Sequence, residues 1–132
     1  MPTRRLRWAT LVFDLDPAEG HEQAGERRAL VVSYEPYHRS AMVTVCPITA
    51  ARSEPIYPNE VAIRRGEAGQ TMDGVILCHQ VRTVSLARAR GTVLGYVADS
   101  GIRSAVRAAV AVQLGLDIDG FADGADAPAR FQ

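Results

Sequence analysis

A short glycine-flanked segment, GHEQAGERR at residues 20–28, gathers side chains that can move protons or hold anions. His21 can act as a base or an acid near neutral pH. Arg27 and Arg28 carry planar guanidinium groups, which suit bidentate contact with a phosphate. A plain turn into an apolar strand needs none of these groups, so the segment is a candidate wall of an anion-binding active site.

Two later segments carry compatible chemistry. Thr49 closes the apolar run VTVCPIT with a hydroxyl that can donate to an oxyanion. His79, Gln80 and Arg82 follow the run GVILC, and Gln80 and Arg82 are separated by one apolar residue. On a strand they would therefore share a face.

The elements that must position these groups are mainly strands. Runs rich in Val, Ile, Leu and Thr, separated by Gly, Pro, Asn or Asp, predict strands at 9–15, 29–34, 42–48, 60–64 and 74–81, the last extending through 82–87.

One helix is predicted at 98–116, where the apolar period changes to that of a helix. Asp99 or Ser100 is the predicted N-cap and Gly115 the stop. Arg103 and Arg107, one turn apart, are expected on the solvated outer side. The predicted buried face comprises Ile102, Val106, Ala109, Val110 and Gln113 or Leu114.

Strands followed by one helix indicate a mainly β, α+β fold, namely a small antiparallel barrel with a C-terminal helix. The 132 residues fit a single domain over 1–117, followed by a flexible tail at 118–132 that is rich in Gly, Ala and Asp.

Bulk composition narrows the function classes. The chain is 47% hydrophobic and 23% charged with zero net charge, so no global basic field indicates nucleic acid. All fifteen cations are arginine.

No run is long enough to span a membrane and no signal peptide is evident, so a cytoplasmic location is expected. Cys46 and Cys78 lie in apolar runs without metal-binding spacing, which predicts buried free thiols.

The order of the motifs resembles the MazF/PemK family of toxin endoribonucleases. The segments DLDPAEGHEQAGERRALVVS, YHRS, VTVCPIT, GVILCHQVRT and a helix ending in VQLGL occur in the family's order between Asp14 and Leu116. The G-H-E-Q-x-G-x-R loop together with Q-V-R-T is fairly specific.

The resemblance implies an SH3-like barrel of the MazF/CcdB type, assembled as a homodimer. It implies metal-independent, sequence-selective cleavage of single-stranded RNA in bacteria, leaving a 2′,3′-cyclic phosphate and a 5′-hydroxyl, with no cofactor. It also implies a MazE-like antitoxin whose C-terminal tail occupies the RNA groove.

The resemblance assigns catalytic roles to two residues. Arg27 matches the arginine of the family's G-x-R-P motif and would stabilise the charged phosphorane; otherwise it is a surface arginine paired with Glu22 or Glu26. Thr49 matches the family's catalytic Thr or Ser; otherwise it only caps a strand end. Arg28 replaces the family's proline, and it can compete for phosphate or substitute for Arg27.

Two histidines complete the catalytic candidates. In the Kid/PemK branch a histidine also occurs at the position of His21, although a loop histidine is often only polar surface. At the position of His79 that branch has an Asp proposed as the base, and the Arg two places earlier is Leu77 here. His79 either accepts the proton, contacts a base edge, or marks the loss of this chemistry.

The remaining candidates would bind RNA or shape the loop. Gln80 would read a base edge, and Arg82 and more weakly Arg39 would take phosphate. Tyr37, with Tyr34, can stack on bases, although edge-strand tyrosines are the simpler interpretation. The loop residues Glu22 and Gln23 are expected to shape the loop and its contact with the antitoxin or partner subunit.

Two other functions stay open. A gyrase poison of the same fold would need the C-terminal Trp-Gly-Ile tip of that branch, whereas this chain ends in Ala-Arg-Phe-Gln. A catalytically weakened relative that binds RNA or an antitoxin is suggested by Arg28, by His79, and by RWATL in place of the family's R-G-D-[IV]-[YW] start.

Overall fold

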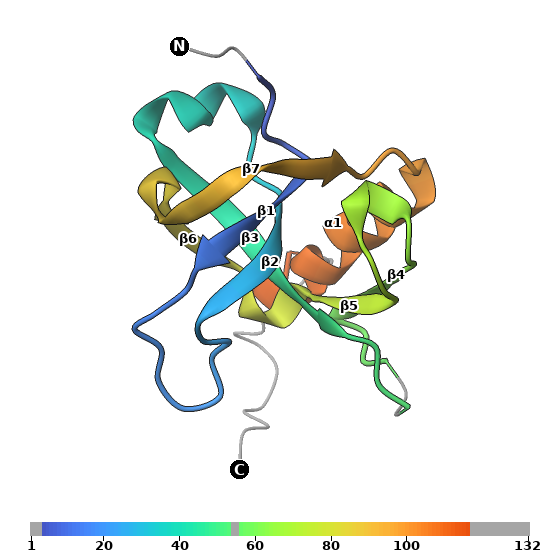
Figure 1. The fold of residues 1–132 in the computed structure, drawn as a ribbon. Helices are drawn as coiled ribbons and strands as arrows, with labels where there is room; N and C mark the ends of the chain where they lie inside the picture. Colours follow the sequence, from blue (N-terminus) through green and yellow to red (C-terminus); the bar gives the residue numbers. More distant parts are fainter. Residues whose placement is uncertain (1–3, 54–55, 117–132) are drawn as a thin grey trace.

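Seven strands form one open, barrel-like antiparallel sheet, with a single helix packed against it (Figure 1). The computed structural model describes residues 4–53 and 56–116, so the predicted tail at 118–132 lies outside the described residues. The strand order is β4-β5-β3-β2-β1-β7, and β6 pairs with β3 off this path. The elements are β1 (Ala9–Asp14), β2 (Glu26–Val31), β3 (Met42–Ala50), β4 (Glu60–Ile63), β5 (Gly74–Leu77), β6 (Arg82–Ser85), β7 (Ala89–Tyr96) and α1 (Ser100–Leu114).

The predicted mainly β fold with a C-terminal helix is confirmed, with three changes in detail. The run at 74–81 is strand only to Leu77, and Cys78–Gln80 forms a 3-10 turn before β6 begins at Arg82. Tyr34 is the N-cap of another 3-10 segment, Glu35–Ser40, rather than a strand residue. β7 was not among the predicted strands, because none of its residues is buried and it therefore lacks an apolar run.

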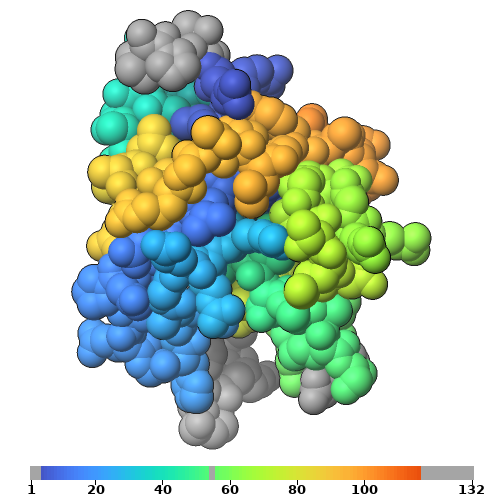
Figure 2. Space-filling model, in the orientation of Figure 1, coloured from blue at the N-terminus to red at the C-terminus, as the bar shows by residue number. Residues whose placement is uncertain are grey.

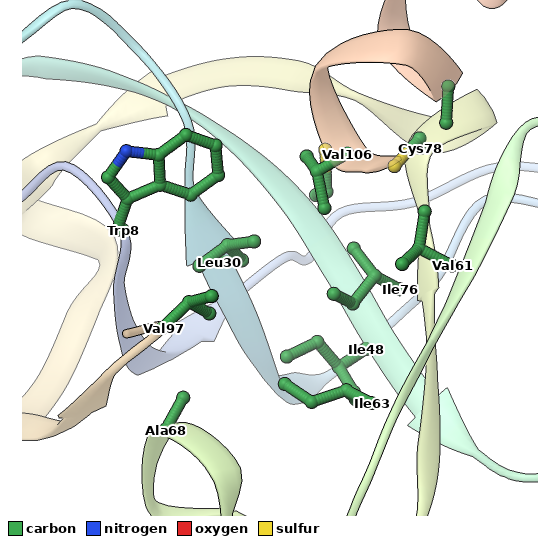
Figure 3. Packing of buried hydrophobic residues seen from close by; sticks show 12 residues of the cluster. Trp8, Leu30, Ile48, Val61, Ile63, Ala68, Ile76, Cys78, Val97 and Val106 are labelled. Atoms are coloured by element: carbon green, nitrogen blue, oxygen red, sulfur yellow. The ribbon is translucent and has the colours of Figure 1, made fainter. Parts of the chain in front are cut away.

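The core consists of two clusters on the two sides of the curved sheet. One lies between the sheet and α1 and includes Trp8, Leu30, Ile76 and Val106 (Figure 3). The second, which includes Phe13, is built by β1, β2, β3 and β6. Residues of β2 and β3 contribute to both clusters, which explains why their runs are almost continuously apolar.

The helix begins and ends where its sequence predicts. The Asp99 carboxylate accepts hydrogen bonds from the Gly101 and Ile102 amides, and Gly115 adopts the left-handed conformation with φ 71°. Val106 and Ala109 are buried, whereas Leu114 is 57% exposed and marks the end of the buried face.

The expectation that Arg103 and Arg107 form a solvated stripe holds for Arg107, which is exposed, whereas Arg103 is half-buried. Both guanidinium groups stack on the ring of Trp8, at 5.5 and 5.7 Å from its centroid. The sequence did not predict this contact with Trp8, because the helical period identifies a face but not the aromatic side chain that a distant segment brings to it.

The two cysteines are buried free thiols, as predicted. A hydrogen bond with the Cys78 thiol and burial both raise the pKa of Cys46, so this thiol stays protonated at neutral pH.

One buried ion pair anchors the start of β4. An Arg52 Nη2 atom lies 2.7 Å from Oε1 of Glu60, whose side chain is only 4% exposed. Burial acts to raise the pKa of Glu60, but the hydrogen bonds from Arg52 and the Tyr57 amide, with the charges of Arg52 and His79, outweigh it and lower the pKa.

We expect Glu60→Gln to lower the free energy of unfolding by about 1–3 kcal/mol at pH 7, because it weakens a charged, buried hydrogen-bond pair. A lowered folded-state pKa means that the contribution is complete above the ordinary value of 4.5 and is lost as the pH falls further. Urea unfolding between pH 7 and pH 3 should therefore show the two proteins converging at low pH. The exposed Glu26→Gln serves as the control, and a gap independent of pH would contradict this assignment.

Candidate active site

The loop between β1 and β2 is closed at its base by backbone hydrogen bonds. The Leu15 amide donates to the Gly25 carbonyl at 2.9 Å, and the Gly25 amide donates to the Asp16 carboxylate at 2.9 Å. Gly20 and Gly25 have φ values of 57° and 74°, which glycine adopts without strain. The loop thereby holds His21 at an exposed position near its tip.

Two side chains from the 78–82 segment fasten this loop to the rest of the molecule. The amide of Gln80 bonds the loop twice: its Oε1 accepts from the Gln23 amide at 2.7 Å, and its Nε2 donates to the His21 carbonyl at 3.2 Å. Arg82 Nη1 donates to the Leu15 carbonyl at 3.3 Å. The segments around residues 20 and 80, far apart in sequence, are thus joined at the site.

A cavity of about 500 Å³ lies between the loop and the 78–82 segment. It brings together both catalytic histidine candidates and four further candidate residues. It is lined by His21, Glu22, Gln23, Pro47, His79, Gln80, Val81 and Arg82. Nδ1 of His79 is buried without a hydrogen-bond partner among the described residues.

The premise that Gln80 and Arg82 share a strand face is wrong, because Gln80 ends a 3-10 turn. Both nevertheless line the cavity, together with the intervening Val81.

A second cavity, of about 260 Å³, contains Arg27 and Thr49. The pairing of β2 with β3 ends at Ala29 and Pro47, and Arg27 and Thr49 each lie two residues beyond this last pair. Figure 2 shows the surface hollowed between the blue segment that leads through β2 and the yellow-green segment before β5. Arg27 and Thr49, which the sequence analysis expected to act on one phosphate, therefore line the same cavity.

The Arg27 side chain is exposed and turned toward the loop, where its Nε donates to the Ala24 carbonyl at 3.0 Å. It forms no ion pair with Glu22, Glu26 or any other described residue, so the alternative role of a paired surface arginine finds no support here. The Glu22 carboxylate instead accepts the Glu19 amide at 2.7 Å within the loop.

Arg28 also lines the second cavity, but its guanidinium is engaged. Its Nη2 donates to the Thr71 hydroxyl at 2.9 Å, and its Nη1 lies 3.5 Å from Oε1 of Gln70. Arg28 therefore ties β2 to the segment before β5, which is a fastening that a proline at this position could not provide.

Sequence reasoning missed the far wall of this cavity. Gln70, Met72, Asp73 and Gly74 line it, and Gly74 approaches the Thr49 carbonyl so closely that an added Cβ would lie 2.8 Å from that oxygen. The polar run GQTMDG before β5 was a visible signal, but only the pairing of β5 with β3 brings it to Thr49.

Tyr37 and Arg39 line neither cavity. They belong to the 3-10 segment Glu35–Ser40, which lies at the end of the molecule opposite the 15–25 loop (Figure 1). Tyr37 is 72% exposed and packs edge to face on Tyr34 with ring centroids 5.5 Å apart. Within a single chain, the structure does not bring these residues to the other candidates.

Among residues 4–53 and 56–116, no group of three or more His, Cys, Asp or Glu side chains is arranged to hold a metal ion. In the same residues, no helix has the length and apolar character needed to cross a membrane.

Comparison with known proteins decides the family. A family model described as PemK-like, MazF-like toxin of type II toxin-antitoxin system matches residues 7–114. The chain belongs to this toxin family. Among family members, it is 37% identical to the Endoribonuclease toxin MazF of Escherichia coli K12 over 103 residues, which cover 77% of this chain and 86% of the relative. Identity to the Endoribonuclease toxin ChpB of the same organism is 35%, covering 73% and 83%.

Solved structures of the family share the fold. MazF from Deinococcus radiodurans superposes with a TM-score of 0.70 at 26% identity, covering 83% of this chain and 94% of that one. A mycobacterial endoribonuclease in complex with its cognate antitoxin gives a TM-score of 0.69 at 23% identity, covering 87% and 99%.

The double hydrogen bond from Gln80 should control the order of the toxin's loop. We expect Gln80→Ala to raise the amide hydrogen-exchange rate of Gln23 by about 10-fold, because both bonds are lost. Gln80→Glu keeps an oxygen acceptor and should raise the rate less. Gln113→Ala, the same change on α1, is the matched control. An unchanged Gln23 exchange rate in Gln80→Ala would contradict the fastening role.

Proposed function

We propose that this chain is an endoribonuclease toxin of a type II toxin–antitoxin pair that cleaves single-stranded RNA without a metal ion. The observation that supports this most is the shared cavity of Arg27 and Thr49, which come from the paired strands β2 and β3. Relatives that share more than a third of their aligned residues with this chain are named endoribonucleases.

In the proposed reaction the RNA supplies its own nucleophile. A base removes the proton of a 2′-hydroxyl, and the resulting oxygen attacks the adjacent phosphorus. The bond from phosphorus to the 5′ oxygen then breaks, and an acid returns a proton to that oxygen. The products are a 2′,3′-cyclic phosphate and a 5′-hydroxyl.

Arg27 and Thr49 would act on the phosphate itself. The guanidinium can donate two hydrogen bonds to the phosphoryl oxygens as negative charge grows, and the hydroxyl can donate a third. An ordinary guanidinium is too weak an acid to release its proton easily, so stabilisation of charge is the role assigned to Arg27.

His79 and His21 would exchange the protons. Both line the larger cavity. This cavity adjoins the smaller one along β3, since Pro47 lines the larger cavity and Thr49, two residues further along the strand, lines the smaller one. A stretch of single-stranded RNA that lies along β3 can therefore place a phosphate at Thr49 and the neighbouring nucleotide in the larger cavity. Of the two histidines, His79 is the proposed base, since its Nδ1 is unpaired among the described residues.

Recognition of the RNA base sequence is assigned to the larger cavity. Arg82 offers the remaining donors of its guanidinium to the RNA, while Gln80 acts mainly by holding the loop, since both ends of its amide are already bonded.

The partners proposed for this chain are those that membership of the family implies. Relatives of the same fold are described in complex with an antitoxin, including MazE-MazF from Deinococcus radiodurans. We propose a MazE-like antitoxin that covers the RNA groove and contacts Glu22 and Gln23, a homodimeric toxin, and a bacterial cytoplasmic location. Tyr37 and Arg39 would meet RNA only if the partner subunit brings the two ends of the molecule together.

We expect Arg27→Ala to slow the cleavage of a single-stranded RNA by about 10²–10³-fold, since a charge-stabilising donor is lost. The assay measures the first-order rate with excess chelator, and Arg64→Ala, an exposed arginine that lines neither cavity, is the control. Cleavage that requires added metal, or that survives Arg27→Ala undiminished, would refute the proposal. Normal RNA affinity without turnover in the unaltered protein would favour the weakened, binding-only relative.

The hydroxyl of Thr49 should matter more than its shape. Thr49→Val retains the size and branching but removes the donor, and we expect a rate loss of about 100-fold, whereas Thr49→Ser should recover most of the rate. Thermal unfolding of each variant separates catalysis from stability. Equal activity of the Val and Ser variants would remove Thr49 from the mechanism.

A base at position 79 predicts a specific pH dependence. His79→Asp replaces the side chain with a more acidic proton acceptor, so the acid limb of the pH–rate profile should move to lower pH. His21→Asn, measured in parallel, should not move that limb. An unshifted acid limb in His79→Asp would assign the base elsewhere.

A further inference from the structure

A third hollow, of about 240 Å³, lies between the start of β1 and the C-terminal half of α1. Its floor is apolar and is contributed by Trp8, Val32, Val106 and Val110, with Leu116 at its margin. We call this hollow the Trp8 groove. It is lined by none of the residues assigned above to RNA cleavage.

Three guanidinium groups surround the indole that lines this groove. Arg7, Arg103 and Arg107 lie 5.2, 5.5 and 5.7 Å from the Trp8 ring centroid. Stacking on the ring supports each cation, but the three like charges also repel one another.

No described carboxylate forms an ion pair with these guanidinium groups. Arg7 and Arg103 each donate a side-chain hydrogen bond to a backbone carbonyl, of Val32 and Val97, and the Arg107 side chain has no hydrogen-bond partner among the described residues. None of the three forms an ion pair within the described part of the chain. An apolar hollow beside an unbalanced cationic cluster suits an occupant that is both acidic and apolar.

The C-terminal end of α1 turns the chain toward this groove. The Gly115 amide bonds the Val112 carbonyl at 3.2 Å, and the Leu116 amide bonds the Ala111 carbonyl at 2.8 Å. With Gly115 in the left-handed conformation, this is the Schellman arrangement, which reverses the chain and returns the residue after the glycine onto the last helical turn. Leu116 consequently lines the groove although it is 72% exposed.

The sequence that follows has the complementary chemistry. Residues 117–132, DIDGFADGADAPARFQ, carry four aspartates against one arginine. Ile118 and Phe121 supply two large apolar side chains directly after Leu116.

We propose that the acidic segment 117–121, which lies outside the described residues, docks back into the Trp8 groove of its own chain. Phe121 or Ile118 fills the apolar floor, and Asp117 and Asp119 neutralise the arginines around Trp8. A hollow of roughly 150 Å³ is known to hold a benzene molecule, so the groove has room for a phenyl ring. Five extended residues span about 17 Å, which gives Phe121 ample reach from Leu116.

Trp8 is the sole tryptophan of the chain and therefore reports on the groove directly. In the full-length protein, Asp117→Asn combined with Asp119→Asn and Phe121→Ala should raise the quenching of Trp8 fluorescence by iodide about threefold, because the released arginines attract the anion. Neutral acrylamide should gain less. Asp126→Asn alone, further along the same segment, is the control and should behave as the unaltered protein.

The occupant is identified by cross-linking. A benzoylphenylalanine in place of Phe121 should form an adduct with Trp8, Val106 or Val110, mapped by mass spectrometry in a mixture of ¹⁴N- and ¹⁵N-labelled protein. Adducts confined to one isotope confirm docking within the chain. Mixed-isotope adducts would assign the groove to a second copy and overturn the proposal, as would unchanged iodide quenching together with no adduct at the groove.

Discussion

The antiparallel register of β3 is the constraint on which the rest of the molecule depends. This single strand is shared by three neighbours: β6 along Met42–Val45, β2 along Val45–Pro47 and β5 along Ile48–Ala50. Because register fixes which side chains are opposite one another, it places β5 and the segment before it beside Thr49, and the pairing with β2 brings Arg27 into the same cavity. A slip of one residue would turn Thr49 away from both.

The sequence predicted the parts of the structure that depend on local chemistry. Apolar runs located five strands, and Asp99 and Gly115 marked the helix ends. Features that depend on long-range neighbours were not predictable in this way. The 3-10 turn at Cys78–Gln80 interrupts a run that reads as one strand, and β7 has no apolar run because none of its residues is buried.

The candidate site likewise combines features that the sequence predicted with features that depend on long-range neighbours. Motif order identified Arg27, Thr49, His21 and His79, and the structure distributes these residues between two cavities that adjoin along β3. What motif order could not reveal is which polar groups are already occupied. Gln80 appeared to be a reader of bases and Arg28 a free cation, yet their hydrogen bonds to the loop and to Thr71 engage them in holding the walls of the cavities. Such partners lie 40 or more positions away in the chain, beyond any pattern of spacing.

The burial of Cys46 and Cys78 has a practical consequence. Thiol-directed reagents attack the thiolate form and need access to it, and these are the chain's two cysteines, both fully enclosed. A cysteine introduced on the surface would consequently be the sole point of attachment for a fluorophore, a spin label or a solid support. The native protein is thus already suited to site-directed spectroscopy, without prior removal of its own sulfur chemistry.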